Sequence, residues 1–160
     1  MAKQQTAPLS WLTELQQHLL PCVDLGGWAI GGSCLLRRLG LLSSHRDIDI
    51  VCTAEAVPQI QQRLQQSGWQ LLPHAVHPQL QSAQFVRLQH PSGMVVELMA
   101  GIKVLQQGVE RHWCFSPSRI EQHQLLPWML LADWLTLYQL FQRPARVQLI
   151  TAWLRQTRQG

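Results

Sequence analysis

The stretch of sequence that decides the fold is GGSCLLRRLGLLSSHRDIDIV, at residues 31–51. It begins with two glycines and a serine and ends with two aspartates that one isoleucine separates. Because side chains alternate between the two faces of a strand, Asp47 and Asp49 are predicted to project from the same face. Like charges this close repel each other, so the pattern favours a neutralising partner such as a hard divalent cation with oxygen ligands.

The glycines are predicted to let the backbone approach a ligand closely. A strand-like run at residues 28–30 leads into them, and Ser33 is predicted to begin a short helix whose first amide groups favour an anion. The alternative is a tight turn in which Ser33 is a plain N-cap, and one geometry can serve both purposes. The stretch is not a P-loop, because no Gly-Lys-Ser/Thr follows. A phosphate cradle beside paired carboxylates predicts a site for a Mg-nucleotide.

The same residues resemble the signature of the DNA polymerase beta-like nucleotidyltransferases. In that signature Gly-Gly or Gly-Ser opens a helix, and an acidic–apolar–acidic strand follows after a spacer, which here is the thirteen residues 34–46. The resemblance is closest to a small bacterial group, written approximately GGTALALxLGxRxSxDIDL, that includes antibiotic nucleotidyltransferases and AbiEii-type toxins. The matching residues are Gly31, Gly32, Ser33, Leu35, Leu39, Gly40, Ser44, Asp47, Ile48 and Asp49.

The resemblance implies a Mg²⁺-dependent transfer of a nucleoside monophosphate from an NTP to a hydroxyl acceptor. Under it, Asp47 and Asp49 are catalytic and bind Mg²⁺, or Mn²⁺ in its place, while Gly31, Gly32 and Ser33 bind the nucleotide. Taken alone, the two aspartates could equally be surface acids of a solvated edge strand. The glycines and the serine at the right spacing favour the metal-ligand interpretation.

Glu97 is the candidate third carboxylate. It is the only acid in the apolar strand predicted at residues 94–99, and an acid among apolar residues needs a partner or an exposed edge. In the resembling enzymes, an acid on a later strand beside the aspartates coordinates the catalytic metal or takes the proton of the incoming hydroxyl. Glu97 is therefore predicted to be catalytic and a metal ligand, with an ordinary edge-strand acid as the alternative.

Several basic residues are candidate triphosphate contacts, because a guanidinium group binds phosphate through two hydrogen bonds. Arg37 and Arg46 are predicted to bind the nucleotide, and Arg38 and Lys103 are further candidates. Arg37 and Arg38 are adjacent, so both cannot face one ligand from a helix. Arg46 could pair with the neighbouring aspartates instead.

Composition limits the alternatives. The 160 residues suit one domain, 46% of them are hydrophobic, and the net charge of +4 is too modest to indicate nucleic-acid binding by itself. Four cysteines without zinc-site spacing favour free thiols and a reducing cytoplasm. The first residues lack the pattern of a signal peptide. Pro127 and Asp133 interrupt the longest apolar stretch, so no membrane is expected to take part.

The residue pattern predicts an α/β (α+β) fold, in which helices flank a small mixed, twisted sheet and a C-terminal helical pair follows. One nucleotidyltransferase-like domain is predicted over residues 1–160, with its core at about 9–105 and the C-terminal helices at about 127–158. Residues 102–105 are expected to extend the sheet and residues 111–119 to be irregular. Strands are predicted at 28–30, 47–52, 69–72, 85–89 and 94–99, and helices at 9–20, 33–39, 57–66, 127–141 and 145–158.

The C-terminal helices also resemble the bacterial group, in its DLLxLxxxxRPKD segment. Here Ala145 and Arg146 replace the Lys-Asp pair, and Tyr138 stands near a position where lysine is common. Two alternatives to the enzyme therefore remain: a non-catalytic NTP-binding or regulatory module, and a toxin-like enzyme that modifies RNA and is controlled by an antitoxin-like partner protein. The acceptor hydroxyl could belong to a small molecule, an RNA or a protein.

Overall fold

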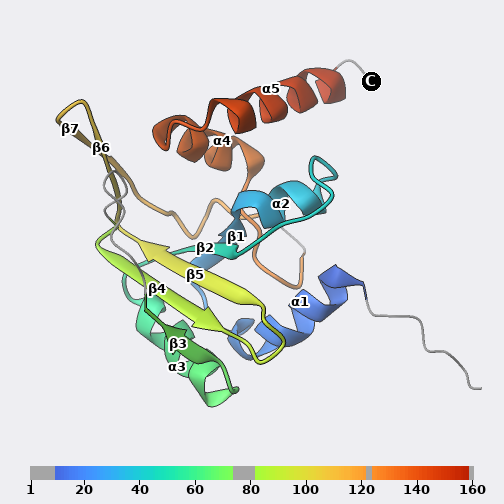
Figure 1. Cartoon of the computed structure of the whole chain (residues 1–160), viewed down its shortest axis with the longest axis vertical. Helices are drawn as coiled ribbons and strands as arrows, with labels where there is room; N and C mark the ends of the chain where they lie inside the picture. Colours follow the sequence, from blue (N-terminus) through green and yellow to red (C-terminus); the bar gives the residue numbers. More distant parts are fainter. Residues whose placement is uncertain (1–9, 74–81, 122–123, 159–160) are drawn as a thin grey trace, which may run out of the picture.

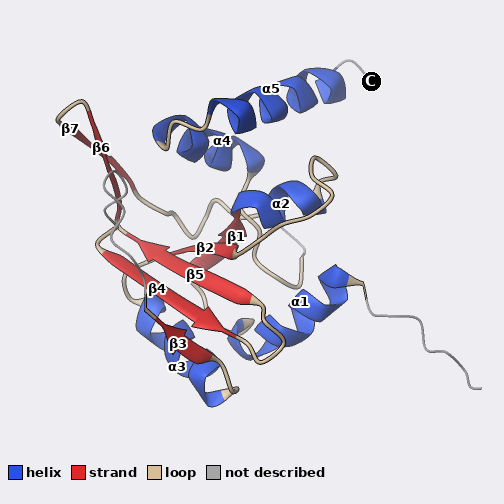
Figure 2. Cartoon of the chain, in the orientation of Figure 1, coloured by secondary structure: helices blue, strands red, loops and turns tan. Residues whose placement is uncertain are grey.

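The computed structural model describes residues 10–73, 82–121 and 124–158. The predicted α+β architecture is confirmed. In chain order, the elements shown in Figures 1 and 2 are α1 (Trp11–Leu19), η1 (Leu20–Cys22), β1 (Trp28–Gly31), α2 (Gly32–Arg38), β2 (Ile48–Cys52), α3 (Ala56–Gln66), β3 (Gln70–Leu72), β4 (Gln84–Gln89), β5 (Val95–Ala100), β6 (Ile102–Gln106), β7 (Val109–Trp113), α4 (Leu131–Leu140) and α5 (Pro144–Arg158).

Five strands form one mixed sheet in the order β1-β2-β5-β4-β3. β2 and β5 are parallel, and the other neighbouring pairs are antiparallel. Figure 1 shows α4 and α5 beyond one side of the sheet, close to α2, and α1 and α3 on the other side. Parallel neighbours require a crossover connection. Between β2 and β5 the chain runs through α3, β3 and β4, and it returns so that β5 lies parallel beside β2.

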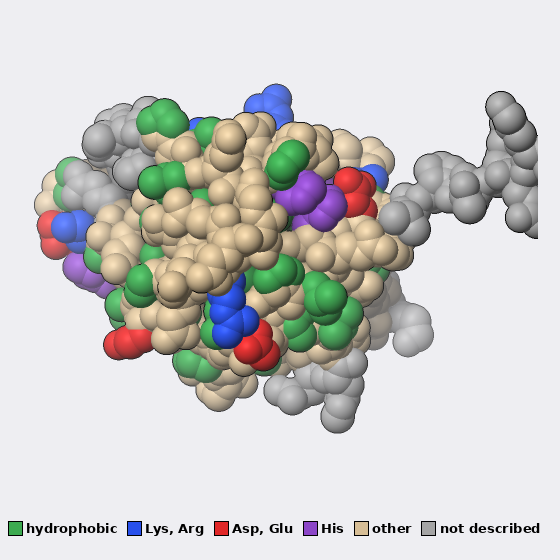
Figure 3. All heavy atoms as spheres, turned by 90° about the horizontal axis from the view of Figure 1, so that it is seen from below, with side chains coloured by type: hydrophobic (Ala, Val, Ile, Leu, Met, Phe, Trp, Pro, Cys, Tyr) green, Lys and Arg blue, Asp and Glu red, His purple; other side chains and the backbone are tan. Residues whose placement is uncertain are grey.

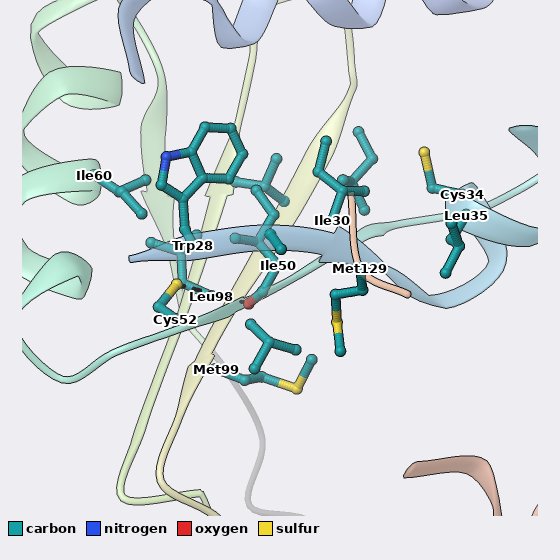
Figure 4. Packing of buried hydrophobic residues seen from close by; sticks show 14 of the residues in the cluster. Trp28, Ile30, Cys34, Leu35, Ile50, Cys52, Ile60, Leu98, Met99 and Met129 are labelled. Atoms are coloured by element: carbon teal, nitrogen blue, oxygen red, sulfur yellow. Dashed lines mark hydrogen bonds between the residues drawn. The ribbon is translucent and has the colours of Figure 1, made fainter. Parts of the chain in front are cut away.

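The core is built around the inner strands. Trp28 of β1 is almost fully buried, and its indole N–H donates to the backbone oxygens of Cys22 and Leu25, at 3.1 and 2.9 Å. Figure 4 shows Trp28 beside Ile60 of α3 and Ile50 of β2. Burying a large apolar side chain contributes about 1.5–3 kcal/mol. This core therefore holds β1, β2 and α3 in fixed relation to one another.

The outer face of α3 is rich in glutamine, and its one charged side chain, Arg63, pairs with Asp24. Its buried positions Val57, Ile60 and Leu64 follow helical spacing, while Gln62 and Gln65 are exposed. Figure 3 shows that uncharged side chains and backbone cover most of this underside of the molecule, with few charged groups. Among the described residues, no helix has the length and apolar character that crossing a membrane requires.

The predicted helix at residues 127–141 begins later than expected, since α4 starts at Leu131. The preceding residues are extended along the free edge of β1: Ile30 N–H donates to the Pro127 oxygen at 2.8 Å, and Met129 N–H donates to the Ile30 oxygen at 3.0 Å. These hydrogen bonds satisfy an edge of the sheet that would otherwise be exposed, which outweighs the helical pattern of the apolar residues.

Residues 102–105 do not extend the main sheet, contrary to the prediction. β6 pairs instead with β7 in a separate two-stranded sheet, so the prediction of irregular structure at 111–119 is also wrong for residues 111–113. Gly101, with φ +61°, bends the chain out of β5. Gln107 and Gly108 then adopt φ values of 50° and 77°, as the tight turn of a two-residue hairpin requires.

A histidine pair joins α1 to the turn between β4 and β5. The rings of His18 and His90 stack with their centroids 3.8 Å apart, and Trp69 meets His90 edge-on at 5.2 Å. Burial, followed by the charge of His18, lowers the pKa of His90, which Glu14 partly opposes. The folded protein therefore resists a proton that the unfolded chain accepts, so stability should fall as the pH drops through the ordinary histidine pKa.

We expect His90→Gln to weaken this acid sensitivity. Thermal melts of parent and variant between pH 7 and pH 5 measure it, and the parent should lose more of its Tm than the variant. His112→Gln, on the exposed strand β7, is the matched control and should behave as the parent does. Equal losses of Tm in all three proteins would contradict the assignment of the acid sensitivity to His90.

Candidate active site

One row of residues crosses the sheet from edge to edge. Gly31 lies opposite Asp49, Asp49 opposite Glu97, Glu97 opposite Arg87, and Arg87 opposite Leu72. Directly opposed side chains on neighbouring strands share a face of the sheet. The backbone register alone therefore places two carboxylates and a guanidinium side by side. The predicted position of strand 94–99 beside the aspartate strand is confirmed.

Arg87 contacts two of the three candidate carboxylates. Its Nη2 donates to Asp47 Oδ2 at 3.4 Å, and its Nε lies 3.3 Å from Glu97 Oε1. The Nε contact is an ion pair without hydrogen-bond geometry, and this buried N–H has no hydrogen-bond partner among the described residues. Asp47 precedes β2, and the same guanidinium that contacts it also contacts Glu97 from the other side.

The third carboxylate, Asp49, lies deepest in the cluster. Burial, followed by the charge of Glu97 and a side-chain hydrogen bond with it, raises the pKa of Asp49 to about 8. Burial, then a hydrogen bond with Asp47, also raises the pKa of Glu97. The residue Asp49 keeps some contact with solvent at the cleft, which moderates these effects. The site therefore disfavours the charged forms of Asp49 and Glu97.

The carboxylates open into a cleft of about 620 Å³. One wall comes from the sheet and from the loop that precedes β2, and the other comes from α4, α5 and the turn between them. The lining residues are Ser33, Ser44, His45, Arg46, Asp47, Asp49, Glu97, Met99, Trp134, Tyr138, Phe141, Arg143 and Arg146. The structure thus brings the predicted residues Ser33, Arg46, Asp47, Asp49 and Glu97 to one cleft.

The two glycines have packing roles that the sequence did not reveal. A Cβ atom on Gly31 would overlap the ring of Trp134, and one on Gly32, which has φ +64°, would overlap the carboxylate of Asp49. Helix α2 begins at Gly32, one residue earlier than predicted, and Ser33 lies inside it. The glycines therefore let α4 and the Asp49 carboxylate approach the β1–α2 turn, and their predicted nucleotide contact stays a prediction.

The structure does not bring Arg37 to the cleft, contrary to expectation. Its guanidinium lies 4.4 Å from the centroid of the Trp11 ring and its Nη1 is 3.2 Å from Nδ1 of His45. A guanidinium can only donate, so Nδ1 accepts and the remaining imidazole proton sits on Nε2. Burial, then the charge of Arg37, lowers the pKa of His45. Arg37 thus fixes the tautomer of a cleft residue and is not itself in the cleft lining.

The other two basic candidates also lie elsewhere. Arg38 pairs with Glu121, with Nη2 3.2 Å from Oε1, and covers the ring of Trp128 at 4.7 Å. Lys103 of β6 lies 3.5 Å from Glu110 of β7. Neither residue is part of the cleft lining. Of the four basic residues proposed from the sequence, only Arg46 lines it.

Sequence reasoning missed three arginines. Arg87 alternates with Phe85 and Gln89 on β4, a signal that it shares their face, but the register with Glu97 could not be known. Arg143 lies between the two predicted C-terminal helices, and Arg146 belongs to the departure from the RPKD pattern, so neither position indicated a role in the site. A further signal lay in the charge pattern, since the chain after Asp133 contains no acidic residue and four arginines.

No family model and no curated protein matches the chain. A solved structure does, that of a protein from Thermotoga maritima provisionally named a nucleotidyltransferase. The match has a TM-score of 0.64 and 17% sequence identity, and it covers 91% of this chain and 93% of the other. The chain has a nucleotidyltransferase-like fold. At 17% identity, the match shows that the two chains share a fold and shows nothing of their activity.

Proposed function

We propose that the protein transfers a nucleoside monophosphate from an NTP to a hydroxyl acceptor. One observation carries the proposal. Asp49 and Glu97, from the parallel strands β2 and β5, meet Asp47 in a cleft that Arg143 and Arg146 also line. Carboxylates on one wall suit a divalent cation, and guanidinium groups on the other suit phosphate oxygens. A Mg-nucleotide combines both kinds of group in one ligand.

The donor set fits Mg²⁺, or Mn²⁺ in its place. All three candidate ligands are carboxylates, which hard divalent cations prefer. Burial, followed by the charge of Glu97, raises the pKa of Asp49, and a bound cation would favour the charged form of this side chain. Among the described residues, no three His, Cys, Asp or Glu side chains are placed to hold a metal ion as they stand. Asp47 and Glu97 face Arg87 instead, so binding requires these side chains to turn.

The residues of the chain have separate tasks in this proposal. Asp47 and Asp49 hold the cation, which when bound offsets the charge of the triphosphate. Glu97, whose pKa is raised by burial and then by a hydrogen bond with Asp47, takes the proton of the acceptor hydroxyl. A bond then forms between the acceptor oxygen and the α-phosphorus, the bond from that phosphorus to the bridging oxygen breaks, and pyrophosphate leaves with the bonding electrons.

The arginines of the far wall would serve the leaving group. Pyrophosphate gains negative charge as the bond to the α-phosphorus breaks, and a positioned guanidinium stabilises that charge more than it stabilises the bound NTP. Arg143 and Arg146 line the cleft from the α4–α5 turn and from α5, and Arg46 lines it beside the aspartates. In this proposal, these three arginines make the nucleotide contacts that the sequence predicted for Arg37.

Glu97→Gln tests the proposal by separating turnover from binding. We expect the variant to lower the rate of label transfer from an α-³²P-NTP by roughly 10²–10⁴-fold, because a positioned general base contributes about that much. Its affinity for Mg-ATP and Mg-GTP, measured by calorimetry, should fall much less than the rate, because two of the three candidate ligands, Asp47 and Asp49, are retained. Acceptors are supplied as a pool of RNAs, proteins and small hydroxyl metabolites.

Glu110→Gln, which neutralises an exposed acid on β7, is the matched control and should transfer label as the parent does. Equal transfer by parent and Glu97→Gln would contradict the role of Glu97. A parent that binds Mg-nucleotide tightly but transfers to no member of the pool would favour the alternative of a nucleotide-binding module. Label found only on RNA would favour the RNA-modifying alternative.

A further inference from the structure

Arg87 holds an unusual position for a basic residue. It lies on β4, directly opposite Glu97 on β5, so the backbone directs its side chain toward the carboxylate cluster. Its guanidinium reaches past Glu97 to Asp47 and contacts both acids, at 3.3 and 3.4 Å. Among the described residues, two of the three candidate carboxylates therefore share one guanidinium as their ion-pair partner.

We propose that Arg87 is a built-in counter-cation that a divalent cation must displace from Asp47 and Glu97, so that it sets the affinity of the cluster for the bare ion. This proposal rests on the proposed function, because it takes the three carboxylates to be the cation site. It adds a regulatory element to that site: a cation gains the carboxylates only when the guanidinium gives up its contacts.

The contacts of Arg87 are weak enough to be exchanged. Both N···O distances lie beyond the usual length of a charge-assisted hydrogen bond, which is about 2.7–2.9 Å. The Nε contact lacks hydrogen-bond geometry, so this donor gains charge attraction from Glu97 but no hydrogen bond. The side chain is 30% exposed, which leaves it a path into solvent.

The contacts are also incomplete. Within the described residues, the ion pairs of Arg87 reach Asp47 and Glu97 but not Asp49. An incoming cation therefore meets one candidate ligand that Arg87 does not contact and two that it holds loosely. Displacement of Arg87 from Asp47 and Glu97 completes the ligand set.

Titration with Mn²⁺ in the absence of nucleotide tests this directly. Free Mn²⁺ is followed by electron paramagnetic resonance, which does not depend on transfer activity. Arg87→Gln should bind Mn²⁺ about tenfold more tightly or better, because it removes a unit positive charge within a few ångströms of a divalent one. Arg87→Lys keeps the charge and should bind close to the parent.

Arg111→Gln is the matched control, because it removes the same charge from β7, outside the five-stranded sheet. It should leave Mn²⁺ affinity at the parental value. Circular dichroism melts establish that each variant is folded. Arg87→Met, which keeps the aliphatic length of the side chain, takes the place of Arg87→Gln if the amide is not tolerated.

The outcomes separate this proposal from the proposed function. Saturable Mn²⁺ binding that is equal in the parent and Arg87→Gln, or weaker in Arg87→Gln, would overturn the role of Arg87 and leave the carboxylate site intact. An equal gain in Mn²⁺ affinity in Arg111→Gln would also overturn it, because the loss of any positive charge would then explain the gain in Arg87→Gln. The absence of saturable binding in every variant would overturn the carboxylate cation site itself, and this proposal with it.

Discussion

Asp49→Asn is expected to abolish nucleotidyl transfer and, at the same time, to stabilise the folded protein. The two effects have one cause. Asp49 lies partly buried in the cleft beside Glu97, and the fold disfavours its charged form. An amide of the same shape removes the charge that the fold resists and also removes a ligand that the cation requires.

The pH dependence gives the sign of the stability change. The pKa of Asp49 is about 8 in the folded protein, against an ordinary value near 4 in the unfolded chain. Between these values the unfolded chain has released its proton and the folded protein has not, so parental stability should fall as the pH rises from about 4 to 8. Above that range the loss is complete. Asp49→Asn lacks this loss, so the difference in free energy of unfolding between the variant and the parent should grow with pH.

The size of this difference in stability follows from the number of pH units between the two pKa values of Asp49. Each pH unit contributes about 1.4 kcal/mol at full effect, and solvent contact in the cleft reduces the sum. We expect Asp49→Asn to exceed the parent by roughly 2–3 kcal/mol in free energy of unfolding at pH 8, and by little at pH 4. Urea unfolding at both pH values measures this, and 10 mM Mg²⁺ should then narrow the gap by stabilising only the parent.

A matched control is available on the far side of the fold. Asp24 is exposed, and a hydrogen bond from Arg63 lowers the pKa of its carboxyl. Asp24→Asn makes the same chemical change but should alter stability with the opposite sign, because its charged form is favoured in the folded protein. An Asp49→Asn protein less stable than the parent at pH 8 would refute the assignment of Asp49 as a disfavoured charge.

The sequence predicted the position of the acidic residues better than that of the basic ones. Asp47, Asp49 and the strand bearing Glu97 came together because alternation within a strand and the apolar character of a buried strand are local properties. Arg87 could not be assigned, since its contact with Glu97 depends on the pairing of β4 and β5 in one register out of several. A shift of one residue would have pointed Arg87 to the opposite face.

The errors at the C-terminal end have a related cause. Residues 127–130 carry helical apolar spacing, but the free edge of β1, a hundred residues earlier in the chain, draws them into extended structure. The same long-range arrangement places Arg143 and Arg146 across the cleft from the carboxylates. The local sequence pattern predicts neither effect, because each depends on where a distant element packs.

Gly32→Ala is expected to lower the free energy of unfolding and to displace the residues around Asp49. Gly32 has φ +64°, where a side chain costs about 1–2 kcal/mol, and its Cβ would overlap the carboxylate of Asp49, which adds about 1–3 kcal/mol. Gly40→Ala has a positive φ but open space around its Cβ, so it isolates the conformational cost. Gly26→Ala has neither problem and should be neutral.

The three alanine variants should therefore rank Gly26, Gly40, Gly32 in increasing loss of stability, with Gly32→Ala lower than the parent by roughly 2–4 kcal/mol in urea unfolding. Gly32→Ala should also bind Mn²⁺ more weakly, since relief of the overlap must displace Asp49 or the β1–α2 turn. Gly40→Ala, at the far end of α2, should keep parental affinity. If Gly32→Ala and Gly40→Ala lost the same stability and bound the ion equally well, the close approach of Asp49 to Gly32 would have no part in shaping the site.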